Sequence, residues 1–449
     1  MMEKFTTGLS TMRVRLAWRT GQLLSAPRVR QIQKSLYNLK LTLLCGFITF
    51  LVLRGTFGAG NFGTPAQDFY EIRELLPHRK EPSRILTQLR EPKKQEADPS
   101  DKNMDTSSTS SYNYSLGPKI TDWDKQRKQW LARHFLSRAG KPKILLVTGS
   151  QPTPCDNPVG DHQLLKAMKN KIDYCRLHGM EIFYNTAHLD QEMAGYWAKL
   201  PLLRRLMLAH PEADWLWWMD SDALFTDMVF ELPMERYESF ELVLHGWEEM
   251  VYDKQSWVGL NTGSFLLRNS QWGLDLLDAW APMGPKGVIR TEVGKMLTNS
   301  LKGRPEFEAD DQSALIHLLI TQSSVWKDKV YLEHSFYLHG YWAILVEKYE
   351  KMMEQYHPGY GDDRWPFITH FVGCKPCGGS GDWERCLKHM ERAFNFADNQ
   401  VLEIYGFRHL SLSTHEVKKI RNDTSNPLED LPNLKTTVPI FSLSTVEAP

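Results

Sequence analysis

The chain has 449 residues and equal numbers of basic and acidic side chains, 54 Lys and Arg against 54 Asp and Glu. Charged residues make up 24% of it and hydrophobic residues 42%, which is typical of globular proteins and excludes a wholly disordered or collagen-like chain. The charges are uneven, because residues 1–40 carry eight basic side chains and one acidic one, which leaves −7 on the remainder. That remainder has no basic field, so no nucleic-acid partner is expected.

An apolar run follows the basic amino-terminal segment. It spans 41–58 and is uncharged apart from Arg54, whose long side chain can reach the lipid headgroups. A buried core helix would be amphipathic, whereas this run is apolar on all sides. A cleaved signal peptide would have a short basic region and a small-residue cleavage site, and this segment has neither. We therefore expect a single transmembrane signal anchor at 41–58, with residues 1–40 as a cytosolic basic tail and everything beyond in the lumen.

Composition divides the luminal part into three. Residues 59–119 lack apolar periodicity and are rich in small polar residues, which predicts a flexible luminal stem. Residues 120–412 are expected to form the folded domain, and the polar, Pro-containing segment 413–449 an irregular tail. Two N-glycosylation sequons begin at Asn113 and Asn422, both in polar segments outside the expected core.

Strand and helix patterns alternate inside the folded domain. The strand-like runs are 143–148, 180–184 and 215–219, and helical spacing of apolar residues fills 164–175 and 197–209. Such units imply right-handed crossovers and a parallel α/β sheet, whose ligands bind beyond the carboxyl ends of the strands. Neither the dinucleotide-binding G-x-G-x-x-G motif nor a P-loop occurs, so an ordinary site of either kind is not expected.

Asp220 and Asp222 directly follow the third strand-like run. Two carboxylates at this spacing can turn toward one divalent cation, and hard oxygen ligands suit Mg²⁺ or Mn²⁺. A metal there would bridge to a nucleotide diphosphate and neutralise the charge that grows as it leaves. The same spacing recurs at Asp122 and Asp124, where no strand precedes it and a solvated turn is expected. A turn or helix cap is the alternative for the first pair. The apolar residues Trp217–Met219 directly precede it, however, and an unpaired carboxylate in buried surroundings is costly, which favours a metal.

Several further motifs occur in order along the chain. They are Val147–Ser150, Trp215–Asp227, Gly259–Phe265, Glu308–Ser313, Thr369–Cys377 and Ala393–Gln400. Together they resemble the plant xyloglucan 6-xylosyltransferases, whose family also contains the galactomannan galactosyltransferases. The resemblance covers about 120–410 plus the short anchor, and Asp275–Lys286 is similar to the xylosyl branch.

The resemblance implies a Rossmann-like α/β domain of the GT-A type that binds a nucleotide sugar. Its expected reaction is metal-dependent and anomer-retaining, and moves xylose from UDP-xylose to O6 of glucose in a β-1,4-glucan, as in xyloglucan side-chain synthesis. A single-pass type II protein of the Golgi membrane is expected from the same resemblance and the single anchor. Assembly with itself or with related transferases is left open.

The family's pattern also implies roles for individual residues. These are Mn²⁺ ligation by Asp220, Asp222 and His370, diphosphate contact by Lys375, and contact with the transferred sugar by Asp311 and Gln312. Further donor-binding residues are expected at Thr148, Gly149, Ser150, Ser221, Asn261, Gly263, Asp310 and Gly373. The chemistry favours such groups independently, because a departing UDP needs cations and an oxocarbenium-like transition state is stabilised by a neighbouring carboxylate or amide.

Each of these motifs also has a structural interpretation. Asp310–Gln312 is a plausible helix start, and His370 after a strand-like run is a plausible core histidine. Asn261–Gly263 brings backbone close to a ligand or forms a tight strand bend. His339 and Trp342 suit an acceptor glucan cleft, with burial in the core as the alternative.

The cysteines allow three interpretations. Cys374, Cys377, Cys386 and His389 have the spacing C-x₂-C-x₈-C-x₂-H, which fits a zinc site, and the first two also fit a dithiol redox pair. In a secretory lumen disulfides are the commoner outcome, and the five cysteines outside the apolar run predict two disulfides and one leftover thiol. Pairing of Cys155 with Cys175 is one option, and the connectivity stays open.

Two other functions fit the sequence. A galactomannan α-1,6-galactosyltransferase would have the same fold, and its UDP-galactose donor differs by one hydroxymethyl group, worth only about 1–3 kcal/mol in an apolar pocket. The second is a catalytically idle luminal scaffold for sibling transferases, and the intact acidic pair speaks against it.

Overall fold

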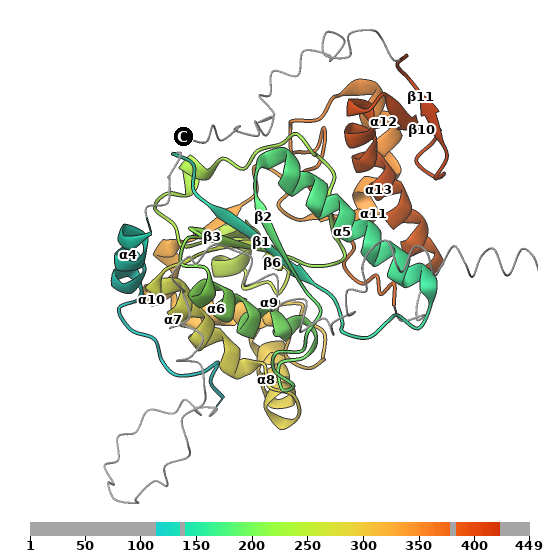
Figure 1. Ribbon diagram of the computed structural model, residues 1–449. Coiled ribbons are helices and arrows are strands. Elements are labelled where there is room, and N and C mark those ends of the chain that lie inside the picture. Colours follow the sequence, from blue (N-terminus) through green and yellow to red (C-terminus); the bar gives the residue numbers. More distant parts are fainter. Residues whose placement is uncertain (1–113, 135–139, 378–382, 423–449) are drawn as a thin grey trace, which may run out of the picture. The chain divides into compact units, whose positions relative to one another are not determined.

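The computed structural model describes residues 114–134, 140–377 and 383–422 (Figure 1). The expected cytosolic tail, the anchor at 41–58 and the sequon at Asn113 lie outside them. Within these described ranges, no helix is both long enough and apolar enough to cross a membrane.

The described residues form three sheets and the helices that cover them. The main sheet has six strands in the order β2-β1-β3-β6-β5-β7, a smaller sheet has the order β4-β9-β8, and β10 pairs with β11. The strands are β1 Ile144–Gly149, β2 Glu181–Asn185, β3 Trp215–Met219, β4 Ala223–Phe225, β5 Leu242–Gly246, β6 Leu260–Arg268, β7 Val330–Glu333, β8 Gly340–Tyr341, β9 Ile368–His370, β10 Phe407–His409 and β11 Val417–Lys419. The helices are α4 Trp123–Arg133, α5 Pro158–His178, α6 Lys199–Ala209, α7 Gln271–Trp280, α8 Val288–Ser300, α9 Asp311–Thr321, α10 Ser323–Trp326, α11 Trp342–Leu345, α12 Tyr349–Gln355 and α13 Trp383–Ile404.

The main sheet confirms the α/β prediction and corrects its all-parallel form. β1 lies between β2 and β3 and is parallel to both, with α5 and α6 in the connections, as the alternating pattern predicts. β6, however, runs antiparallel to both β3 and β5, while β7 is parallel to β5. The sheet is mixed because β6 follows β5 as its antiparallel neighbour and inserts beside β3, and such a pair needs no crossover helix.

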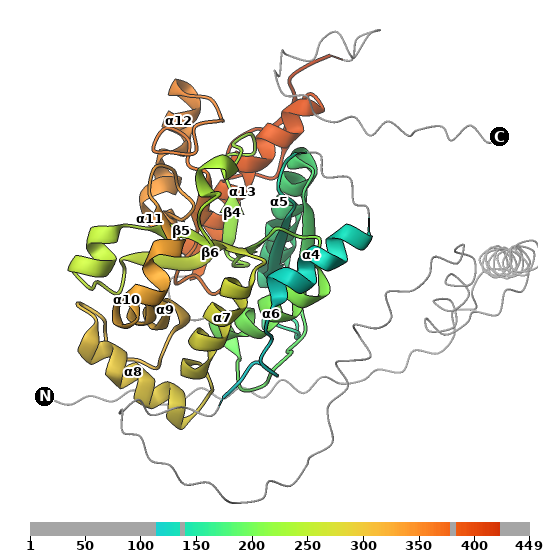
Figure 2. The same cartoon turned by 90° about the vertical axis from the view of Figure 1, so that its left-hand side faces the viewer.

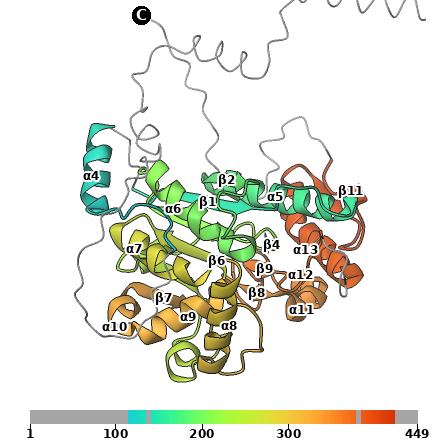
Figure 3. The ribbon, with the colours of Figure 1, turned by 90° about the horizontal axis from the view of Figure 1, so that it is seen from below.

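Each face of the main sheet is covered by its own layer of helices (Figures 2 and 3). Side chains alternate along β3, so Leu216 and Trp218 pack in one core with α6, α7 and α9. Trp215, Trp217 and Met219 pack in the other core, toward α5 and β4. This alternation explains the unbroken tryptophan-rich run of β3, because both faces of the strand are buried.

The folded region begins earlier and ends later than the sequence predicts. Tyr114 and Leu116, which we placed in the stem, pack against the main core, and the Tyr114 hydroxyl donates a 2.6 Å hydrogen bond to Asp190. At the other end, β11 lies within the expected irregular tail and pairs antiparallel with β10. All three side chains of β11 are exposed, so apolar periodicity does not reveal this strand.

The small sheet joins two distant parts of the chain. β4 pairs antiparallel with β9, which places Ala223 opposite His370, and β8 pairs with the other edge of β9. Asp227, just beyond β4, is fully buried and accepts N–H bonds from Gly359 and Gly361 on the segment that leads into β9. Burial raises the pKa of Asp227 to about 6, and these backbone donors act in the opposite direction.

Asp227→Ala tests how firmly this segment is held. The substitution leaves buried N–H groups without an acceptor, so the free energy of unfolding should fall by about 3 kcal/mol in a denaturant titration. Asp253→Ala, at an exposed aspartate, is the matched control. An equally small loss for both variants would show that Asp227 does not hold the segment.

Candidate active site

Asp220, Asp222 and His370 lie together at the carboxyl end of β3. One ligand atom from each falls within 4.8 Å of the others. His370 Nε2 is 3.2 Å from Asp222 Oδ1 and 3.7 Å from Asp220 Oδ2. The sheet geometry explains this meeting, because Asp220 directly follows β3, Asp222 precedes β4, and His370 ends β9 opposite Ala223.

The acidic turn is fixed by neighbouring groups. Trp218 Nε1 donates a 2.6 Å hydrogen bond to Asp220 Oδ1, and the Asp220 backbone N–H donates to the Gly263 carbonyl at 2.8 Å. Gly263 is required by packing, since a Cβ there would lie 2.0 Å from Cε1 of His370. Ser221, at the tip of the turn, is half-exposed.

The electrostatics of this cluster favour a cation. Burial lowers the pKa of His370, but the carboxylates of Asp222 and Asp220 raise it by more, so its pKa lies above the ordinary histidine value. A pocket that attracts a proton in this way also attracts a metal ion. Two carboxylate oxygens and one imidazole nitrogen suit a divalent ion of intermediate hardness such as Mn²⁺, so the residues fit the expected metal.

A buried lysine connects this cluster to α9, and the sequence analysis missed it. Lys199 Nζ lies 2.8 Å from Asp311 Oδ2 and 3.4 Å from Asp220 Oδ1, and its side chain is 2% exposed. Burial lowers the pKa of Lys199 and the two carboxylates raise it by more, so the ammonium stays charged. A lysine opening an otherwise apolar helix segment is the signal that could have found it.

Asp311 and Gln312 are both drawn into the same network. Asp311 is 5% exposed, and its Oδ2 accepts from the Thr262 hydroxyl at 2.9 Å as well as from Lys199. Gln312 is half-exposed, with its Oε1 accepting from Asn261 Nδ2 at 3.0 Å and its Nε2 donating to the Trp257 carbonyl. Each end of the Gln312 amide therefore keeps further hydrogen-bonding capacity for a ligand.

Asp310 has a structural role in place of the expected donor contact. Its Oδ1 accepts from the Ser313 backbone N–H at 2.7 Å, so Asp310 is the N-cap of α9. Its Oδ2 accepts from Arg304 at 2.9 Å. Both carboxylate oxygens are thereby engaged, which confirms the helix-start interpretation for this residue.

A second buried lysine supports the acidic turn from behind. Lys171 of α5 is 1% exposed, and its Nζ donates to the Ala223 carbonyl at 2.6 Å. Burial lowers the pKa of Lys171 to about 8, although Asp222 and Asp220 act in the opposite direction. Its ammonium therefore offsets part of the negative charge gathered at the turn.

The end of β1 carries three of the expected donor-binding residues, Thr148, Gly149 and Ser150. The side chain of Thr148 is fully buried within β1, and its expected donor contact stays a prediction. Gly149 and Ser150 are half-buried at the strand end, and Gly149 packs so closely on Asn185 that a Cβ would lie 2.4 Å from its carbonyl oxygen. The Tyr184 hydroxyl donates to Ser150 Oγ at 2.9 Å.

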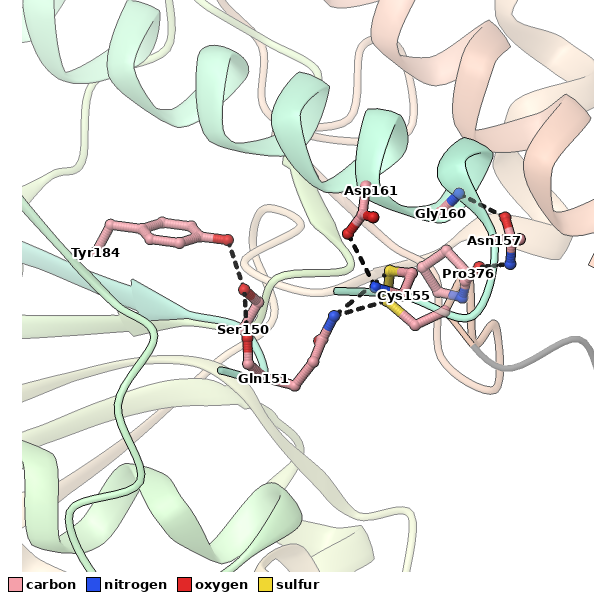
Figure 4. Close-up of a disulfide and its surroundings, with 9 residues drawn as sticks. Ser150, Gln151, Cys155, Asn157, Gly160, Asp161, Tyr184 and Pro376 are labelled. Atoms are coloured by element: carbon pink, nitrogen blue, oxygen red, sulfur yellow. Dashed lines mark hydrogen bonds between the residues drawn. A yellow bond between two sulfur atoms is a disulfide. The ribbon is translucent and has the colours of Figure 1, made fainter. Parts of the chain in front are cut away.

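Lys375 is exposed on a loop that two disulfides hold. Figure 4 shows the disulfide of Cys155 and its surroundings. Cys374 pairs with Cys386 of α13, and Cys377 pairs with Cys155 in the segment after β1. Asn157 Nδ2 donates to the Pro376 carbonyl at 3.0 Å, and Gln151 Nε2 reaches Cys377 Sγ at 2.9 Å. The loop, which includes Gly373 at a φ of 86°, is therefore fastened to the β1 side of the site.

The disulfides settle the open cysteine question. Two disulfides and one leftover thiol are confirmed, but the pairing of Cys155 with Cys175 is wrong, because Cys175 is a buried free thiol in α5. The zinc interpretation fails because His389 instead contacts Glu347 and the Arg385 carbonyl, each at 2.7 Å. The redox interpretation fails because Cys374 and Cys377 have different partners.

The expected acceptor residues do not form an open aromatic face. Trp342 is 7% exposed, stacks on Phe371 and donates from Nε1 to the Val372 carbonyl at 3.1 Å, so it belongs to the core. His339 is half-buried beside the cluster of Asp220, Asp222 and His370, with its Nδ1 2.9 Å from Nδ1 of His370. Tyr341, between them, is the exposed aromatic residue of this segment.

The family profile described as the galactosyl transferase GMA12/MNN10 family matches residues 140–381. The chain belongs to this family. Xyloglucan 6-xylosyltransferase 2 of Arabidopsis thaliana is 58% identical over 94% of this chain and 98% of its own length. Probable xyloglucan 6-xylosyltransferase 1 of Oryza sativa subsp. indica is 57% identical over the same shares, 94% and 98%. The chain is thus a glycosyltransferase, and its resemblance to the xyloglucan 6-xylosyltransferases is confirmed.

Among solved structures, a glycosyltransferase involved in the glycosylation of the major capsid of PBCV-1 has a similar structure, and the match covers 56% of this chain and 99% of that chain. Its sequence identity is 13% and its TM-score is 0.35.

Removing the disulfide between Cys155 and Cys377 should weaken donor binding by this transferase. In the variant Cys155→Ser/Cys377→Ser, the loop that carries Lys375 loses a crosslink spanning 222 residues of sequence. We expect the free energy of unfolding to fall by about 3–5 kcal/mol and UDP to bind more weakly, as measured by denaturant titration and calorimetry. Cys175→Ala, which removes the thiol outside both disulfides, is the control. Unchanged UDP affinity in the double variant would separate the crosslink from the donor site.

Proposed function

We propose that this glycosyltransferase moves xylose from UDP-xylose to O6 of glucose in a β-1,4-glucan, with Mn²⁺ as its metal. The observation that carries the proposal is the cluster of Asp220, Asp222 and His370 at the carboxyl end of β3. It occurs in a chain 58% identical to an Arabidopsis protein named for xylosyl transfer to xyloglucan. The cluster supports binding of a nucleotide diphosphate, and the relative's name supports the substrate class.

Asp220, Asp222 and His370 would hold the metal. When bound, a divalent cation neutralises the charge that develops on the diphosphate as UDP departs. Lys375 would add a second positive charge to the diphosphate. Its disulfide-held loop supports this role, because a fixed ammonium loses less freedom on binding than a mobile one.

Asp311 and Gln312 at the start of α9 would have different roles. Asp311 has little exposed surface and its carboxylate is shared between Lys199 and Thr262, so we assign it to holding that network in place. Gln312 is the more exposed side chain and would contact the sugar ring through its remaining amide hydrogen or lone pair. Asn261 would fix the Gln312 amide orientation through their 3.0 Å hydrogen bond.

The chemical step would be a displacement on one face of the sugar. The bond between the anomeric carbon and the UDP oxygen breaks, and the bond from the acceptor O6 forms on the same face, so the configuration is retained. The acceptor proton passes to the departing phosphate oxygen. No protein carboxylate is needed as a covalent nucleophile, which agrees with the engaged state of Asp311.

One assay distinguishes the candidate functions. The purified chain is incubated with Mn²⁺, cello-oligosaccharides and either UDP-xylose or UDP-galactose. Product with UDP-xylose alone supports the proposal. Product with UDP-galactose alone would favour galactosyl transfer, which the description of the matching family also names. A chain that binds neither donor and makes no product would be a luminal scaffold.

The same assay tests the metal. We expect excess chelator to abolish transfer, and Asp220→Asn to reduce it by about 100-fold or more, because the diphosphate charge is then no longer neutralised. Re-addition of Mn²⁺ should restore the chelated wild-type chain. Full activity in excess chelator would contradict the metal-dependent mechanism.

We also propose that residues 41–58 anchor the chain in the Golgi membrane with 114–422 in the lumen. Two disulfides within the described residues and the exposed position of Asn422 support this orientation. Glycosidase treatment of the protein made in plant cells should increase its gel mobility, and Asn113→Gln/Asn422→Gln should remove that shift. A chain without glycan that protease digests in sealed vesicles would contradict a luminal domain.

A further inference from the structure

The ring nitrogens of two histidines meet behind the metal cluster. His339 Nδ1 and His370 Nδ1 are 2.9 Å apart, and the two rings are perpendicular with centroids at 4.9 Å. At this distance one nitrogen carries the proton and the other accepts it, because two N–H groups or two lone pairs would repel each other. The tautomers of the two rings are therefore linked.

The direction of this hydrogen bond follows from the other nitrogen of His370. Its Nε2 faces the carboxylates of Asp222 and Asp220 at 3.2 and 3.7 Å. A nitrogen that ligates a metal offers its lone pair, which leaves the proton of the neutral ring on Nδ1. His370 then donates from Nδ1, and His339 accepts at Nδ1 and keeps its own proton on Nε2.

The surroundings hold both rings in this arrangement. Gly263 packs directly against the His370 ring on one side. His339 lies beside His245 of β5, with ring centroids 5.7 Å apart, so it cannot turn away freely.

We propose that His339 is a positioning residue for the metal site. Its Nδ1 accepts a hydrogen bond from Nδ1–H of His370, and this bond would orient Nε2 of His370 toward the metal. This inference rests on the metal dependence proposed above. It also gives His339 a role other than the acceptor contact expected from the sequence.

Three substitutions separate hydrogen bonding from packing. His339→Phe keeps a ring and removes both nitrogens. His339→Asn places an amide oxygen close to the former Nδ1, whereas His339→Gln extends the amide past it. His245→Phe alters the neighbouring ring, which has no hydrogen bond to His370.

The readout is Mn²⁺ affinity without sugar nucleotide, from the electron paramagnetic resonance signal of free Mn²⁺ titrated with the full chain. We expect His339→Phe and His339→Gln to weaken binding by about 10–100-fold and His339→Asn to restore most of it. His245→Phe should bind as the wild type does. Circular dichroism identifies any variant that fails to fold. If His339→Phe does not fold, the comparison of His339→Asn with His339→Gln tests the hydrogen bond.

Two outcomes would overturn the inference alone. One is wild-type affinity in both His339→Phe and His339→Gln. The other is equal weakening by His245→Phe, which would assign the effect to ring packing. A wild-type chain that binds no Mn²⁺ would instead overturn the metal dependence on which the inference rests, so the two failures are distinguishable.

Discussion

The antiparallel pairing of β4 with β9 is the interaction on which the site depends. It sets Ala223 opposite His370, so a histidine from the late part of the chain lies beside two aspartates that end an early strand. The buried Asp227 reinforces the pairing by accepting backbone N–H groups from the segment that leads into β9. Without this sheet the acidic turn would be an ordinary solvated D-x-D, as the spacing alone allows.

Charge balance in the site is achieved by buried lysines as well as by any metal. Lys199 contacts the carboxylates of Asp220 and Asp311, and Lys171 lies behind the acidic turn. Each is almost completely buried, where an unpaired ammonium would be costly. The two lysines therefore let several carboxylates gather in one place, and Lys199 alone links Asp220 to Asp311.

Much of the fold and part of the site could be predicted from the sequence. The strands β1 and β3 follow unbroken apolar runs, because both of their faces are buried, and the helices α5 and α6 follow helical spacing of apolar residues. The direction of β6 could not be predicted, since periodicity says nothing about which strand becomes its neighbour. Asp220 and Asp222 are visible as a motif, but their meeting with His370 came only from the family resemblance. Lys199 was missed because a buried charge is recognised by its partners, and those lie far away in sequence.

The disulfide between Cys155 and Cys377 also constrains how the protein is made. During synthesis Cys155 and Cys175 leave the ribosome long before Cys377, which follows Cys155 by 222 positions. The nascent chain thus offers an early, incorrect partner to Cys155. Packing of α5 withdraws that partner, because Cys175 is only 1% exposed once the helix lies on the sheet. The order in which α5 packs and the last segments emerge therefore governs whether the loop that carries Lys375 is closed correctly.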